Sequence, residues 1–235
     1  MKYAFAGCSL TRGYGLVDKK DGYPHLVSAM HNAECVNIAQ DGYSNQLIFI
    51  SALQQIANDS PDIMFVQWTS TGRHWMSPAP DQWIKITGGK VDPEKFGVDL
   101  RQFHDALITL NCEYQHIMDL IQYCDILNKL HDRVIFINGA VFWSKDMFDK
   151  DLTYSNYTKS VLDFDNQSDD TIQTTLDKLR TQYARLVNTQ WINQFKTMLT
   201  AQFDYATDRR HPGIKSNKMY ADWIIEYLEK TKIAN

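Results

Sequence analysis

Hydrophobic and polar residues follow two different periods along this chain. Four short runs are apolar over most of their length, which is typical of strands in a buried sheet. They cover Lys2–Ala6, Cys35–Ala39, Asp62–Trp68 and Arg133–Asn138. Residues 63–66 and 134–137 contain no polar residue. These two strands are therefore predicted to be central and covered by helices on both faces.

Longer segments between and after these runs repeat their apolar residues every three or four positions, as a helix does when one face packs on a core. The predicted helices cover Tyr23–Asn32, Ser44–Asn58, Arg101–Leu130, about 170–199 and about 215–229. Strands that alternate with helices indicate βαβ units and a parallel sheet. We expect an α/β fold with three α/β/α layers, in one domain that spans 1–235.

Two stretches, at about 70–99 and about 139–169, interrupt this alternation. The first contains several Trp, Pro and Gly residues, and the second is rich in Phe, Tyr, Ser, Asn and Asp. Both follow predicted strands, and in open α/β sheets the loops after the carboxyl ends of strands form the ligand crevice. The two stretches are predicted to wall a binding site; for the second, a surface excursion fits equally well.

Composition excludes several classes of function. The 235 residues are 44% hydrophobic, enough for a sizeable core, and the formal net charge is -4 with scattered Lys and Arg, so no nucleic-acid partner is expected. No apolar stretch approaches about 18 residues and no basic start precedes an apolar segment, so neither a membrane span nor a secretory signal is expected. We expect a location in the cytoplasm or in association with a virion.

The cysteines and histidines do not form a metal-ligand pattern. The four cysteines, Cys8, Cys35, Cys112 and Cys124, have neither the spacing of a zinc site nor the density of a disulfide scaffold, and are expected to be reduced and mostly buried. The seven histidines contain no His-x-x-x-His or His-Glu-x-x-His pair. No metal and no other cofactor is expected.

Residues with catalytic chemistry stand near the two ends of the chain. Ser9 follows the first predicted strand, and Asp208 precedes His211 by three residues on a turn that ends in Pro-Gly. A carboxylate can orient an imidazole, which in turn takes the proton of a serine hydroxyl. The backbone N–H groups of Ser9 and of Gly42, after the second strand, are candidate donors to an oxyanion, with Thr69 after the third strand beside them.

The order of these pieces resembles the SGNH/GDSL hydrolase family. The segment Gly7-Cys8-Ser9-Leu10-Thr11 is similar to the family's Gly-Asp-Ser-Leu-Thr block, with Cys8 in the place of the acid. Residues 37–42 and 208–213 resemble its second and last blocks. The resemblance covers nearly the whole chain. It implies a flavodoxin-like domain of the esterase, lipase, thioesterase or carbohydrate deacetylase kind, which works without a cofactor.

The third family block differs. The family has Gly-x-Asn-Asp after the third strand, and its asparagine donates to the oxyanion, whereas this chain reads Gln67-Trp68-Thr69-Ser70. Followed by Arg73, this stretch resembles a divergent branch found in phages and bacteria. Loss of one such donor typically lowers the rate about 10²–10³-fold, unless Thr69, Arg73 or Asn45 replaces it.

The sequence thus predicts a serine esterase with a Ser9-His211-Asp208 triad. Its expected substrate is a small-molecule or glycan carboxylic ester, with an O-acetyl group on a carbohydrate as one candidate. Asn45, Trp68 and Arg73 are the predicted substrate-binding residues.

Three alternatives remain open at this point. Cys8 is a possible nucleophile, although strand alternation should turn it away from the direction of Ser9. The altered third block and the aromatic excursions also fit a catalytically impaired binding or assembly module, for instance in a phage particle. A nucleotide or flavin binder is suggested only by the strand-helix order, since no Gly-x-Gly-x-x-Gly or P-loop follows the first strand.

Overall fold

The computed structural model describes residues 1–70, 73–79, 82–87, 113–139, 191–192 and 198–233. Its main feature is a five-stranded sheet in which every pair of neighbouring strands is parallel. The strands are β1 (Lys2–Ala6), β2 (Glu34–Asn37), β3 (Ile63–Trp68), β6 (Val134–Asn138) and β7 (Trp191–Ile192). Their order across the sheet is β2-β1-β3-β6-β7.

The two strands predicted to be central lie in the interior of the sheet. Every residue of β3 and of β6 is buried, and β3 pairs with β1 on one side and β6 on the other. Phe5 stacks on Phe65 across β1 and β3, with ring centroids 4.6 Å apart. The continuous apolar runs therefore reflect burial on both faces of the sheet, as the sequence predicted.

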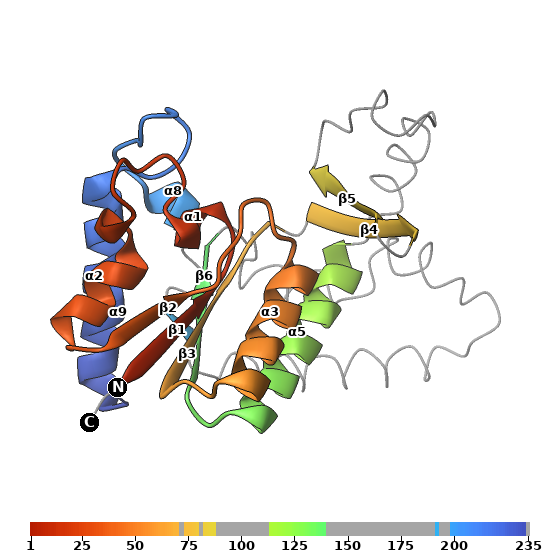
Figure 1. Cartoon of the computed structure of the whole chain (residues 1–235), viewed down its shortest axis with the longest axis horizontal. Coiled ribbons are helices and arrows are strands. Elements are labelled where there is room, and N and C mark those ends of the chain that lie inside the picture. The colour runs from red at the N-terminus through yellow and green to blue at the C-terminus, as the bar shows by residue number, and fades with distance from the viewer. Residues whose placement is uncertain (71–72, 80–81, 88–112, 140–190, 193–197, 234–235) are drawn as a thin grey trace, which may run out of the picture.

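Helices cover both faces of this sheet (Figure 1). On one face lie α2 (Tyr23–Met30) and α9 (Ile214–Thr231), which bury their apolar residues against Tyr3, Phe5 and Phe65. On the other face lie α3 (Asn45–Asn58) and α5 (Glu113–Leu130). The arrangement is the predicted three-layer α/β/α fold.

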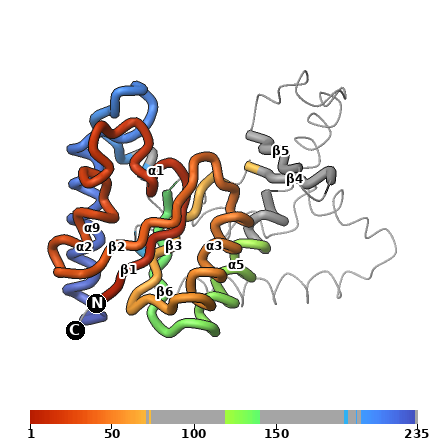
Figure 2. The backbone as a smooth tube through the Cα atoms, in the orientation of Figure 1, coloured from red at the N-terminus to blue at the C-terminus, as the bar shows by residue number. Residues whose placement is uncertain are grey.

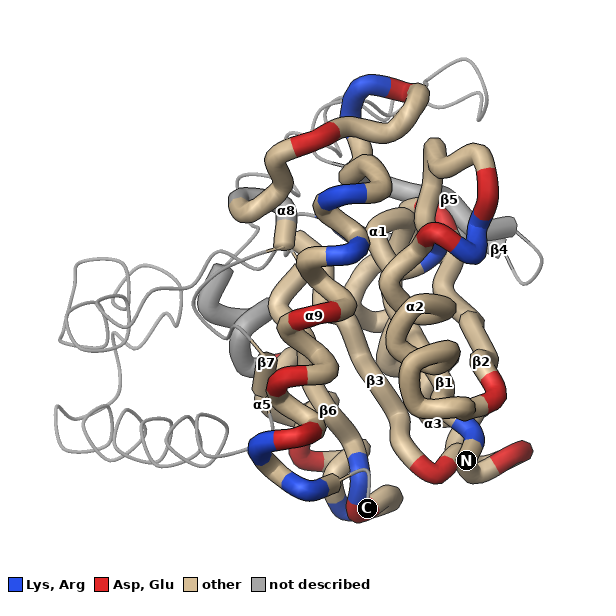
Figure 3. The backbone as a smooth tube through the Cα atoms, turned by 90° about the vertical axis from the view of Figure 1, so that its left-hand side faces the viewer, with Lys and Arg blue, Asp and Glu red and all other residues tan. Residues whose placement is uncertain are grey.

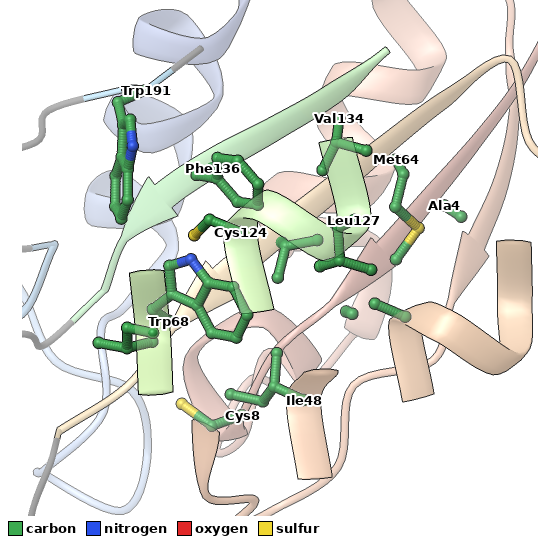
Figure 4. Close-up of a cluster of buried hydrophobic side chains, with 14 of the residues drawn as sticks. Ala4, Cys8, Ile48, Met64, Trp68, Cys124, Leu127, Val134, Phe136 and Trp191 are labelled. Carbon is green, nitrogen blue, oxygen red and sulfur yellow. The ribbon is translucent and has the colours of Figure 1, made fainter. Parts of the chain in front are cut away.

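The α3 and α5 side of the sheet contains one of two apolar clusters. Trp68, at the end of β3, is fully buried there beside Phe136 and Cys124 (Figure 4). Cys8 belongs to the same cluster and is also fully buried. Truncation of a buried tryptophan to alanine typically costs about 3–5 kcal/mol, so Trp68 contributes substantially to the stability of this layer.

Shorter elements connect the layers. The helix α1 (Ser9–Arg12) follows β1 directly, and the 3₁₀ turn η1 (Lys19–Asp21) precedes α2. Within the excursion at 70–99, β4 (Arg73–Ala79) pairs antiparallel with β5 (Gln82–Thr87). The helix α8 (Met198–Ala201) precedes the loop that leads into α9.

The predicted elements agree with the structure except near residue 191. Trp191 and Ile192 were placed in a helical segment, but they form β7 and pair with β6. Because both residues are large, apolar and buried, their spacing alone does not separate a short buried strand from a helix. The predicted helical residues 101–112, 170–190 and 193–197, and the excursion from 140 to 169, lie outside the described residues.

The carboxyl ends of the strands and the chain termini lie at opposite ends of the sheet. Both termini lie beyond the end of the sheet where β1 begins (Figure 2). Basic and acidic residues are interspersed along the described backbone in the view of Figure 3. Among the helices that the structure describes, none combines the length and the apolar character needed to cross a bilayer.

Candidate active site

Ser9 is presented by the short helix that follows β1. It is the first residue of α1, and only 5% of its surface is exposed. Gly13 ends this helix in a left-handed conformation, and the backbone N–H of Tyr14 donates to the Ser9 carbonyl at 3.0 Å. A helix of one turn thus places the Ser9 hydroxyl at the carboxyl end of the sheet, where open α/β folds bind their ligands.

The structure brings Ser9, His211 and Asp208 into one hydrogen-bonded line. The Nε2 atom of His211 lies 2.9 Å from the Ser9 Oγ, and its Nδ1 atom lies 2.5 Å from the Asp208 Oδ2. With the ring proton on Nδ1, the imidazole donates to Asp208 and accepts the proton of the Ser9 hydroxyl. This is the geometry that a general base needs beside a nucleophile.

Asp208 remains charged because backbone N–H groups of its own loop donate hydrogen bonds to its carboxylate. Its Oδ1 accepts the N–H groups of Arg210 and His211, each at 3.1 Å. Burial raises the pKa of Asp208, but hydrogen bonds from the His211 ring and from these two N–H groups outweigh it and lower the pKa to about 2. The carboxylate therefore carries its negative charge throughout the neutral range.

The loop from 204 to 213 is a closed unit that leads into α9. Backbone hydrogen bonds join Ala206 to His211 at 2.8 Å and Gly213 to Asp204 at 3.0 Å. The Asp204 carboxylate accepts the N–H groups of Lys215 and Ser216 at 2.9 and 2.7 Å and thereby caps the first turn of α9. The acid and the histidine are thus fixed relative to a long helix that packs on the sheet.

The second candidate region lies at the ends of β2 and β3. Gly42 has a φ of +75°, which suits glycine and rarely other residues. The Asn45 side chain donates to the Thr69 carbonyl at 3.0 Å and accepts the Thr69 N–H at 2.8 Å. The Thr69 hydroxyl is buried and has no hydrogen-bond partner in the described part of the chain.

Hydrogen bonds tie the loop after β2 to the Ser9 segment. The backbone N–H of Gln40 donates to the Gly7 carbonyl at 3.3 Å, and the Asn37 side chain donates to the Thr11 carbonyl at 3.0 Å. An ion pair of 2.6 Å joins Arg12 to Asp41. The segment from Asn37 to Asp41, directly before Gly42, is therefore attached to the Gly7–Arg12 segment at three points.

A buried polar cluster beneath α1 was not predicted. The Thr11 hydroxyl donates to the Gln67 Oε1 at 2.5 Å and lies 2.8 Å from the Tyr23 hydroxyl. Both Thr11 and Gln67 are fully buried, and burial strongly raises the pKa of Tyr23. Since unpaired buried polar groups are costly, this cluster ties α1 to β3 and α2 in one arrangement.

One sequence-based expectation on this region needs correction. Trp68 was predicted to bind substrate, but its ring is buried in the apolar cluster of Figure 4 and packs on Phe136 and Tyr123. Cys8, the alternative nucleophile, is fully buried in the same cluster.

Arg73 and Asn45 occupy different environments. Asn45 lies at the start of α3 and binds Thr69, while Ser44 caps that helix by accepting the N–H of Leu47 at 3.4 Å. Arg73 begins β4, and its Nη1 is buried without a hydrogen-bond partner in the described part of the chain. The described contacts of Ser9 and His211 do not include Arg73, and its role in substrate binding stays a prediction.

Tyr14 was missed as a site residue. Its ring lies against the His211 imidazole, with centroids 4.9 Å apart, and it is 44% exposed. Its position five residues after Ser9, in a loop between two glycines, was visible in the sequence, but its approach to a residue near the other end of the chain was not. Among the described residues, no group of three His, Cys, Asp or Glu side chains forms a metal-ligand cluster.

Comparison with known proteins gives matches only among solved structures. No protein-family model matches the chain, and no curated protein matches it. A family two carbohydrate esterase from Clostridium thermocellum, in complex with cellohexaose, is 9% identical; the match covers 100% of this chain and 65% of that one, with a TM-score of 0.52. TesA is 11% identical over 98% of this chain and 99% of that one, with a TM-score of 0.51.

A third similar structure is a carbohydrate esterase whose active site displays divergent catalytic and non-catalytic binding functions. It is 15% identical, the match covers 100% of this chain and 70% of that one, and the TM-score is 0.50. At these identities the likeness concerns the fold. The chain has an SGNH/GDSL hydrolase-like fold, in agreement with the motifs in its sequence.

Proposed function

We propose that this protein is a serine ester hydrolase of the SGNH type. The observation that carries the proposal is the line of two hydrogen bonds from Ser9 through His211 to Asp208. These three residues come from segments about 200 positions apart, so their alignment is a property of the fold and not of one local motif. The similarity of the chain to structures described as esterases adds support for an ester as the substrate.

In the proposed reaction Ser9 is the nucleophile. Its Oγ attacks the acyl carbon while the Nε2 of His211 takes the hydroxyl proton, and the tetrahedral intermediate collapses when the imidazolium returns this proton to the leaving alcohol. Water then attacks the acyl-enzyme by the same route and regenerates the Ser9 hydroxyl. Asp208 keeps the second ring proton on Nδ1 and stabilises the imidazolium.

The oxyanion would be held by three donors. Two are the backbone N–H groups of Ser9 and Gly42, and the third is the hydroxyl of Thr69, in the position where the family has an asparagine side chain. The support for Thr69 is that its hydroxyl is buried and without a partner in the described residues, a costly state for a polar group unless it serves a ligand. Asn45 fixes the Thr69 backbone from both sides.

The substrate class we propose is a carboxylic ester, with O-acetyl groups on a carbohydrate as the first candidates. The test is release of p-nitrophenol from p-nitrophenyl acetate and of acetate from acetylated xylose, by the unmodified protein, Ser9→Ala and His211→Ala. Ser51→Ala and His25→Ala are matched controls on α3 and α2. We expect turnover in the unmodified protein and both controls, and none in the two site variants; turnover by Ser9→Ala would contradict the proposal.

A second candidate function is non-catalytic binding at the same site. The observation that favours it is the absence of the family's asparagine, since a hydroxyl on a short side chain replaces the longer amide donor. On this alternative, the folded protein would bind acetylated oligosaccharides equally well with or without the Ser9 hydroxyl and would release no acetate.

A further inference from the structure

The loop after α1 contacts the loop before α9 at Gly15. In Figure 1 these two loops lie side by side at the same end of the sheet. The Gly15 carbonyl accepts two hydrogen bonds from Thr207, one from its backbone N–H at 3.2 Å and one from its hydroxyl at 2.7 Å. The nucleophile's own loop is thus clamped to the loop that carries Asp208 and His211.

Gly15 leaves no room for a side chain at this contact. A Cβ atom at position 15 would lie 2.9 Å from the Cβ of Ala206 and 2.9 Å from the Oδ1 of Asp208. Its φ of +80° lies in the region that glycine adopts without cost. The backbone of the Ser9 loop therefore packs directly on the carboxylate that orients His211.

Hydrogen bonds within its own loop hold the Asp208 carboxylate in this position. The same Oδ1 atom accepts the N–H groups of Arg210 and His211, and Oδ2 holds the His211 ring. The loop is further closed by the hydrogen bond between Ala206 and His211. Any group that pushes Asp208 away must move the loop as a unit, and with it the Nε2 atom that faces Ser9.

The segment that contains Gly15 also contacts the His211 imidazole. Tyr14, directly before Gly15, places its ring against His211 at a centroid distance of 4.9 Å. The imidazole is thus contacted by a residue whose position depends on the conformation of Gly15.

We propose that Gly15, with Thr207, is a positioning element that sets the distance between the Ser9 hydroxyl and the His211 imidazole. It makes no contact with the acyl group and acts through Asp208 and the loop. The proposal rests on the proposed function, because the distance it sets matters for catalysis only if Ser9 is the nucleophile.

The test compares Gly15→Ala with Asn32→Ala. Asn32 also has a positive φ, of +49°, but it lies between α2 and β2 and belongs to neither the Ser9 loop nor the Asp208 loop. Alanine tolerates this region less well than asparagine does, so the two variants share backbone strain and only Gly15→Ala adds a contact with Asp208. The readouts are the rate of labelling of Ser9 by a fluorophosphonate and the midpoint of thermal unfolding.

We expect both variants to lose thermal stability, Gly15→Ala more than its control because its Cβ also clashes with Ala206 and Asp208. Only Gly15→Ala should label slowly, by about 10²-fold, the usual effect of a misplacement of about 1 Å at a reacting group. Thr207→Val, which removes one of the two donors to Gly15, should slow labelling less, and Thr207→Ser should restore the rate. If Gly15→Ala does not fold, the Thr207 pair tests the same clamp.

Normal labelling of folded Gly15→Ala, or an equal loss of labelling in Asn32→Ala, would overturn the proposal. If the unmodified protein does not label at all, the proposed function fails, and a separate readout tests the positioning. This readout is the low-field proton resonance of the His211 Nδ1–H bonded to Asp208. It should be present in the unmodified protein and in Asn32→Ala and be shifted or lost in Gly15→Ala; an unchanged resonance would refute the positioning role.

Discussion

The two halves of the candidate site are built differently. In the half that would move the proton, both oxygens of Asp208 and both ring nitrogens of His211 have hydrogen-bond partners at 2.5 to 3.1 Å. In the half that would bind the oxyanion, the Thr69 hydroxyl is buried without a partner in the described residues. The first half is aligned before any substrate arrives, whereas the second retains a donor that has no partner among the described residues.

This difference indicates which variants of the site should change the stability of the fold. Satisfied hydrogen bonds hold the loop from 204 to 213, and their loss should affect both folding and rate. An unsatisfied hydroxyl costs folding energy, and its removal should lower the rate while leaving stability unchanged or improved. Variants in the first half should therefore lower activity and stability together, whereas variants in the second half should lower activity alone.

The largest effect is expected from Asp208→Asn, which tests the aligned half. The amide cannot accept the Nδ1 proton in the same way that the carboxylate does, so it favours the wrong imidazole tautomer and does not stabilise the imidazolium. We expect kcat/KM for ester hydrolysis to fall by about 10⁴-fold. Asp59→Asn, at an exposed carboxylate paired with Lys2, is the control. A loss of less than tenfold in Asp208→Asn would remove the acid from the mechanism.

Thr69→Val tests the other half. The substitution keeps the shape of the side chain and removes the hydroxyl, so we expect kcat to fall by about 10²–10³-fold. The free energy of unfolding should stay equal or rise by about 1 kcal/mol, because a buried polar group without a partner disappears. Thr69→Ser keeps the hydroxyl and should retain most of the activity. Full activity of Thr69→Val would assign the third donor to another residue.

A smaller effect is expected from Asn45→Ala, which loosens the backbone of Thr69 without touching its hydroxyl. The variant loses two hydrogen bonds to Thr69, and the unfolding free energy should fall by about 1–3 kcal/mol. We expect kcat to fall about tenfold, as one donor becomes less fixed. Asn58→Ala, on an exposed turn of the same helix, should change neither value; equal stability of the two variants would contradict the bracing role of Asn45.

The smallest effect concerns stability in acid. The folded pKa of Asp208 is about 2, below the usual value of 3.8, so its contribution to stability is complete above pH 4 and is lost as the pH falls from 4 towards 2. The pKa of Asp204 is also lowered and acts in the same direction. The difference in unfolding free energy between the unmodified protein and Asp208→Asn should therefore shrink from pH 5 to pH 2. A constant difference would show that the Asp208 charge does not stabilise the fold.

Much of the fold was readable from the sequence because its signals are local. The runs that form β1, β3 and β6 are apolar and short, and Ser44 caps α3 as its residue type indicates. The segment at 191–192 was misassigned because two buried residues carry no period. Trp68 was misassigned because an aromatic residue at a strand end can face either the site or the core.

For the candidate site, the sequence supplied the residue types but not their contacts. Ser9, Asp208 and His211 were predicted together, and the structure places them within hydrogen-bond distance. Gly15, Thr207 and Tyr14 were not predicted, since their importance lies in contacts between segments about 190 residues apart.

The most direct test of the account is covalent labelling of Ser9. The folded protein is treated with a fluorophosphonate, and the modified peptide is identified by mass spectrometry, with His211→Ala in parallel. If His211 activates Ser9, a single adduct forms on Ser9, and it is lost when the imidazole is removed. A folded protein without an adduct, or an adduct that forms equally fast in His211→Ala, would contradict the claim that this serine is activated by the histidine.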